Sequence, residues 1–99
     1  HLGVVVLQID SIVAKNNGIP KGLYIKELEQ NSVLYKKNVR EGDIITHING
    51  KEVGDVNGFF SIMGAAKPGD RMRFKLYRKD SSGNGNSFEV VVTLEEERR

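Results

Sequence analysis

Apolar and polar residues alternate along much of this chain, which is the pattern of β-strands with one buried face. Residues 71–77 are apolar at every second position from Met72 to Leu76, with charged or aromatic residues between them. Residues 88–94 repeat the pattern. The two stretches are separated by a Ser-, Gly- and Asn-rich segment, so we expect them to form a hairpin.

Three further strands are predicted nearer the N-terminus. Residues 3–9 contain the uninterrupted apolar run Val4 to Leu7, which predicts a central strand with both faces covered. Residues 43–48 form another apolar strand ahead of an Asn-Gly turn. Residues 22–28 alternate, so we expect two side chains to point inward, Leu23 and Ile25, and two outward, Tyr24 and Lys26.

One stretch has the helical period instead. Asp55 is a suitable N-cap for a helix over residues 56–66. Gly58 and Gly64 cost that helix about 1 kcal/mol each relative to Ala, so we expect packing on the sheet to hold it. The main apolar stripe of this helix follows the spacing i, i+3, i+4, i+7 and consists of Val56, Phe59, Phe60 and Met63. Ile62 lies on a neighbouring stripe.

Two short helices complete the prediction. Asp10 or Ser11 can cap a helix through Lys15, which Gly18 ends. Ser32 can cap one or two further turns. We therefore expect an α+β fold: a partly open barrel of five or six mostly antiparallel strands with one main helix and one or two short ones.

The composition excludes several classes of partner but does not by itself indicate a function. The 99 residues suit one domain, which we place at residues 1–94, followed by a solvated tail over 95–99. The net charge of +2 is small and dispersed, so we do not expect nucleic acid as a partner. No apolar run is long enough to insert in a membrane. The chain has no Met at its start and no signal sequence, so we expect it to be one domain of a longer protein.

We expect neither a metal nor another cofactor. Cysteine is absent, and no Asp/Glu cluster has the spacing of a calcium loop. His1 is expected to be exposed and His47 to be a surface strand residue. No phrase typical of a catalytic serine surrounds any of the six serines, so we expect this chain alone to be non-catalytic.

The most specific motif is the stretch from Gly42 to Val53, GDIITHINGKEV. It resembles the core of PDZ domains. Three other stretches match the same family in the expected order: an x-apolar-Gly-apolar loop, a central strand with the turn beyond it, and a turn after the main helix. They are His1–Val4, Gly22–Ser32 and Lys67–Asp70.

The order of these motifs resembles the permuted PDZ domains of bacterial proteases, particularly trypsin-like serine proteases of the HtrA/Deg type. The loop opens the chain and an extra strand closes it. That resemblance implies a protease domain on the N-terminal side, a role in protein quality control, and an extracytoplasmic location in a bacterial cell envelope. Site-2 and tail-specific proteases carry permuted PDZ domains too, and remain an alternative.

The resemblance also implies a peptide site. A peptide with an apolar C-terminal end, or an unfolded apolar segment, would add as a strand beside Val4–Val6. Its carboxylate would be bound by the backbone N–H groups of Leu2, Gly3 and Val4. The alternative is a structural module whose groove mediates oligomer contacts. We expect the groove itself to include Val5, Val6, Gly58, Phe59 and Ile62.

Gly58 carries a separate prediction. In animal PDZ domains the first position of the groove helix often holds a His that reads Ser or Thr two residues before the peptide end. Gly58 aligns there and offers no polar group, so we expect apolar residues to be tolerated at that peptide position.

Overall fold

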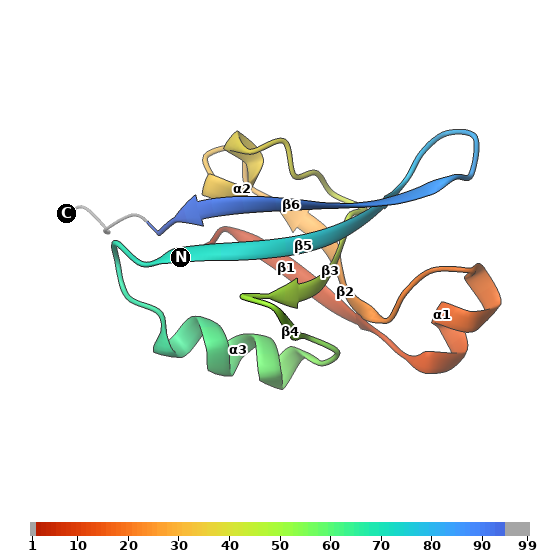
Figure 1. Ribbon diagram of the computed structural model, residues 1–99, viewed down its shortest axis with the longest axis horizontal. Helices are drawn as coiled ribbons and strands as arrows, with labels where there is room; N and C mark the ends of the chain where they lie inside the picture. Colours follow the sequence, from red (N-terminus) through yellow and green to blue (C-terminus); the bar gives the residue numbers. More distant parts are fainter. Residues whose placement is uncertain (1, 95–99) are drawn as a thin grey trace.

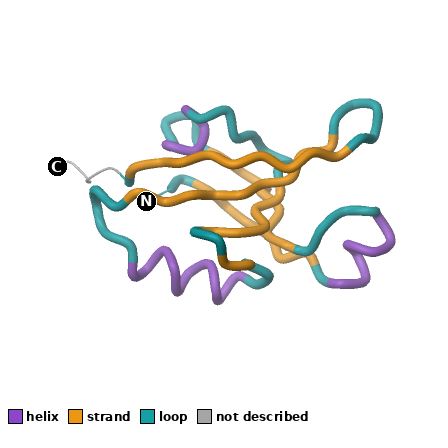
Figure 2. Tube along the Cα trace, viewed as in Figure 1, coloured by secondary structure: helices purple, strands orange, loops and turns teal. Residues whose placement is uncertain are grey.

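A computed structural model describes residues 2–94 of the chain; His1 and the expected tail, residues 95–99, lie outside the described residues. Short helices lie at the margins of a strand-rich body (Figure 2). The elements in chain order are β1 (Val4–Ile9), α1 (Ser11–Asn17), β2 (Gly22–Leu28), α2 (Val33–Lys36), β3 (Ile44–Ile48), β4 (Lys51–Glu52), α3 (Val56–Ala65), β5 (Arg71–Lys79) and β6 (Gly85–Thr93).

The strands form a single antiparallel sheet in the order β1-β2-β3-β5-β6, with β4 paired to β3. β5 and β6 make the expected hairpin and run side by side (Figure 1). In the same view α2 and α3 lie on opposite sides of the molecule. The predicted α+β architecture of six strands and a few short helices is confirmed.

The core lies between the inward faces of the strands and the helices α2 and α3. Leu23 and Ile25 are fully buried, as their alternation with exposed Tyr24 and Lys26 predicts. Each such side chain contributes about 1.5–3 kcal/mol through its removal from water. The other fully buried apolar side chains are Leu34, Val39, Ile45, Ile48, Phe74 and Leu76.

The helix caps form as predicted. The Asp10 carboxylate accepts the Val13 N–H at 2.8 Å, and the Ser32 hydroxyl oxygen accepts the Leu34 N–H at 3.1 Å. Asp55 caps α3 by accepting the N–H of Gly58 at 2.6 Å. These bonds satisfy backbone donors that the first turn of a helix leaves free. The starts of all three helices are therefore encoded locally.

The prediction that the first strand is central was wrong. β1 pairs with β2 and is the edge of the sheet. Val4 and Val6 pack against the core, whereas Val5 and Leu7 are 46% and 48% exposed. An apolar run indicates a strand buried on both faces, yet here one of those faces is open. The sequence pattern does not distinguish a covered face from one that awaits a partner.

An ion pair between Asp43, the residue before β3, and Arg78 of β5 was not predicted. The Asp43 carboxylate is 2% exposed and accepts two bonds from Arg78, Nε to Oδ1 at 2.8 Å and Nη2 to Oδ2 at 2.7 Å. The Arg40 N–H donates to Oδ2 at 2.9 Å. The bonds to Asp43 raise the pKa of Arg78 above its ordinary value. The pair fixes the loop that carries Glu41.

Candidate functional site

A groove with a volume of about 710 Å³ lies between β1 and α3. Its position follows from the fold, because β1 is the edge strand and α3 begins close to the end of β1. The groove is lined by apolar side chains from the N-terminal loop, the start of β1, the end of β2 and α3: Leu2, Val4, Val5, Leu28, Phe59, Phe60 and Met63.

The loop that leads into β1 closes one end of the groove. Gly3 has a φ of 65°, a left-handed conformation that residues with a Cβ rarely adopt. Its carbonyl oxygen accepts the Glu29 N–H at 2.9 Å. A Cβ on Gly3 would lie 3.0–3.1 Å from the Glu29 side chain. Both the backbone conformation and the close approach of Glu29 therefore favour glycine here.

The wall supplied by α3 differs in part from the expected one. Phe59 is buried and lines the groove, and Phe60 lies beside it with ring centroids 5.9 Å apart. Phe60 is 61% exposed, so it is not part of the buried stripe that the helical spacing predicted. Met63 completes this wall. Ile62 instead borders a separate hollow near the start of β5.

The remaining predicted residues divide into two groups. Leu2, Gly3, Val4 and Val5 all border the groove. Val6 packs on the core and Gly58 is the third residue of α3, and neither lies among the residues that line the hollow. Gly58 is thus not the first helical position that the alignment assigned to it.

A side chain that the sequence did not single out joins the two walls at the far end. The Gln8 side-chain oxygen, at the end of β1, accepts the Val56 N–H at 3.2 Å. Val56 is the first residue of α3, where the backbone N–H has no partner within the helix. The bond holds the start of α3 against β1. No local signal marks a glutamine for this contact, because it joins positions 48 residues apart.

The rim of the groove is acidic, which the sequence pattern did not predict. Glu27, Glu29 and Glu41 line it, and no Lys, Arg or His does so within the described chain. The Glu41 carboxylate accepts the Leu28 N–H at 3.1 Å. The three glutamates come from β2, the turn after it and the loop before β3, so only the fold brings them together.

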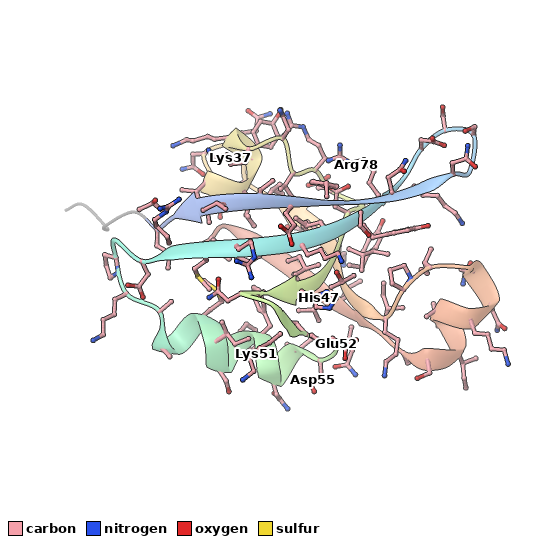
Figure 3. All side chains as sticks on the ribbon, viewed as in Figure 1. Lys37, His47, Lys51, Glu52, Asp55 and Arg78 are labelled. Atoms are coloured by element: carbon pink, nitrogen blue, oxygen red, sulfur yellow. The ribbon has the colours of Figure 1, made fainter. Side chains whose placement is uncertain are left out.

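A second hollow of about 520 Å³ lies beside β3 and β4. It includes His47 and Glu52, which are directly paired across these strands (Figure 3). The Thr46 hydroxyl bonds the Lys75 carbonyl at 3.2 Å and lies 3.0 Å from His47 Nδ1. Among residues 2–94, no group of His, Asp and Glu is arranged to hold a metal, and no helix is long and apolar enough to cross a membrane.

The sequence is similar to a known family of domains and to bacterial serine proteases. The model of the PDZ domain matches residues 1–92. The periplasmic pH-dependent serine endoprotease DegQ of Escherichia coli K12 is 31% identical over 96 residues, which are 95% of this chain and 20% of that protein. The serine protease Do-like HtrA of Lactobacillus helveticus is 29% identical over 102 residues, 96% of this chain and 24% of that protein. The chain thus spans a quarter or less of these relatives.

Solved structures share the fold at low sequence identity. The HtrA-type protease AlgW with a decapeptide matches with a TM-score of 0.77 and 18% identity, over all of this chain and 30% of that one. The HtrA3 PDZ domain bound to a phage-derived ligand, FGRWV, matches with a TM-score of 0.70 and 17% identity, over 96% of this chain and 82% of that one.

Proposed function

The chain belongs to the PDZ domain family, and on this basis we propose that it binds the C-terminal ends of apolar peptides in the groove between β1 and α3. The peptide adds to the sheet as a strand antiparallel to β1. Its backbone supplies most of the attraction, and the apolar wall selects the last side chain.

The observation that carries this proposal is the open edge of β1 facing an apolar groove. A sheet edge leaves backbone N–H and C=O groups unpaired, and natural proteins usually cover or interrupt such an edge. Here the edge is instead bordered by apolar side chains, including the exposed ring of Phe60. A missing strand explains both the unpaired edge and the exposed apolar residues of β1.

The loop at Leu2, Gly3 and Val4 is the place for the peptide carboxylate. Its left-handed turn at Gly3 can present successive N–H groups to one anion, and charge-assisted bonds of this kind are about twice as strong as neutral ones. With the carboxylate at this loop, the final side chain enters the groove between Val4 and Phe59. We expect Val, Leu or Phe there.

The relatives suggest the setting in which the domain works. Those named above are serine proteases, and DegQ is named periplasmic. We therefore place this domain on the C-terminal side of a trypsin-like protease domain, in the extracytoplasmic space of a bacterium, where it delivers or senses damaged proteins. Binding regulates the protease only if it favours one of two protease states.

A titration with fluorescent peptides tests the proposal. Peptides ending in Val, Leu or Phe are compared with the same peptides carrying a C-terminal amide, and we expect the amide to lose most of the affinity. Equal affinity of acid and amide would show that the groove binds internal segments and would remove the carboxylate site. Absence of binding by either form would overturn the proposal in favour of a structural role for the groove.

A pair of variants locates the binding. Phe60→Glu places a charge on the apolar wall at an exposed position, so we expect it to weaken binding without unfolding the domain. Ile12→Glu, on α1, is its matched control: Ile12 is also exposed and apolar but does not line the groove. An equal effect of both variants would contradict the assignment of the groove.

A further inference from the structure

We propose that the groove prefers peptides whose penultimate residue is Lys or Arg, and that Glu27 on β2 is the specificity-determining residue. This inference rests on the proposed function, because it assumes a peptide strand beside β1. It adds a feature of the ligand that the apolar groove alone does not define.

The register of the sheet places Glu27 in line with the ligand. Val5 on β1 lies directly opposite Glu27 on β2, and both side chains are exposed. Residues opposite each other in an antiparallel pair share one face of the sheet. A peptide residue opposite Val5 on the free edge therefore extends the same row, with the order Glu27, Val5, ligand.

The distance between the ligand residue and Glu27 determines which ligand side chains can reach Glu27. Neighbouring strands are about 4.8 Å apart, so the ligand residue lies about 10 Å from Glu27 across Val5. A Lys or Arg side chain spans most of that distance, and the glutamate side chain spans the rest. The apolar stem of the cation would rest on Val5, which is 46% exposed and has no other cover in the described chain.

The position of the cation in the peptide follows from the antiparallel direction. With the last residue opposite Val4, its side chain points inward as that of Val4 does. The residue before it then lies opposite Val5 and points outward. The penultimate side chain is therefore the one that Glu27 can contact.

The charge around the groove favours a cation at this point. The residues described as lining the groove include Glu27, Glu29 and Glu41 and no basic side chain. Glu27 forms no ion pair with any residue from 2 to 94. Lys26, the nearest cation in sequence, is the extra residue of a β-bulge and has no partner on β1.

The test is a titration of the domain with three peptides that differ only at the penultimate residue, Lys, Gln or Glu, before a final Val. We expect the Lys peptide to bind about two- to five-fold more tightly than the Gln peptide, the range for an exposed ion pair. The Glu peptide should bind most weakly. The differences should shrink as salt is raised, because the pair is exposed.

Variants then assign the effect to one residue. Glu27→Gln should make the Lys and Gln peptides bind equally. Glu27→Lys should reverse the order and favour the Glu peptide. Glu52→Gln is the matched control, because it removes the same charge at an exposed position on β4, outside the groove.

The outcomes separate this inference from the proposed function. Equal binding of all three peptides, or a Lys preference that Glu27→Gln leaves intact, overturns the role of Glu27 while peptide binding stands. Failure of all three peptides to bind overturns both proposals. A preference that is lost equally in Glu27→Gln and Glu52→Gln would indicate a general effect of net charge and would also refute the specific contact.

Discussion

Replacing Arg78 by Met tests whether its ion pair with Asp43 stabilises the fold. Methionine keeps an unbranched stem of similar length and can still pack beside Phe88, over whose ring the Arg78 guanidinium lies at 4.8 Å. It removes both bonds to Asp43 and the bond from Arg78 Nη2 to the Asn38 carbonyl at 2.8 Å. Of the bonds that residues 2–94 make to it, the buried Asp43 carboxylate then keeps only the one from the Arg40 N–H.

The expected loss is about 2 kcal/mol. Removing one partner of a fully buried ion pair costs about 3–5 kcal/mol, because the other charge is left without compensation. The Asp43 side chain is buried, but that of Arg78 is 43% exposed, so water can reach part of the site and the cost falls below this range. Arg78→Lys should lose about half as much, because it keeps the charge but not the two-pronged geometry.

Urea denaturation followed by circular dichroism measures the effect. With a slope of about 1–2 kcal/mol per molar urea for a domain of this size, Arg78→Met should lower the midpoint by about 1–2 M. The double variant with Asp43→Asn should lose less than the two single variants together, because the residues are in contact. A loss below about 0.5 kcal/mol for Arg78→Met would refute the reasoning and would class the pair with ordinary surface salt bridges.

Three other predictions concern single positions. Gly64→Ala should stabilise the domain by about 1 kcal/mol in the same assay, because a Cβ there has open space and Ala favours the helix; a destabilised variant would contradict this. Gly3→Ala should cost about 1–2 kcal/mol from its left-handed backbone and weaken peptide binding, and unchanged stability and affinity would oppose it. Bonds from Ser82 and Asn84 lower the pKa of Asp80. The ionised Asp80 therefore stabilises the β5–β6 loop above about pH 4, and this stabilisation is lost as the pH falls further. Amide exchange of Ser82, measured by NMR, should become faster relative to an unfolded reference as the pH falls through this range, and constant protection would contradict the prediction.

The features that the sequence predicted correctly are those with local causes. The caps at Asp10, Ser32 and Asp55 each act over two or three residues, so the sequence shows them directly. The alternating strands can also be predicted locally, because the apolar or polar character of each residue indicates whether its side chain points into the core or into solvent. Family resemblance then ordered these elements into one fold, which the pattern alone does not do.

The site was harder to predict because its parts meet only in the folded chain. The loop at Gly3 and the ring of Phe59 were identified through the family resemblance. The contact of Gln8 with Val56 and the acidic rim depend on strand order and register, which no local pattern encodes. The exposed position of Phe60 shows the limit of helical periodicity: spacing indicates which residues share a face, but not how wide the covered part of that face is.

The bond between the Gln8 side chain and the start of α3 limits the length of β1 along which a peptide can lie. Between the loop at Gly3 and this bond, the strand offers four residues, Val4 to Leu7, which is about 14 Å of extended chain. The proposed peptide would therefore pair with β1 over about four residues, a span that a chain end fills without the rest of the ligand passing the bond between Gln8 and Val56.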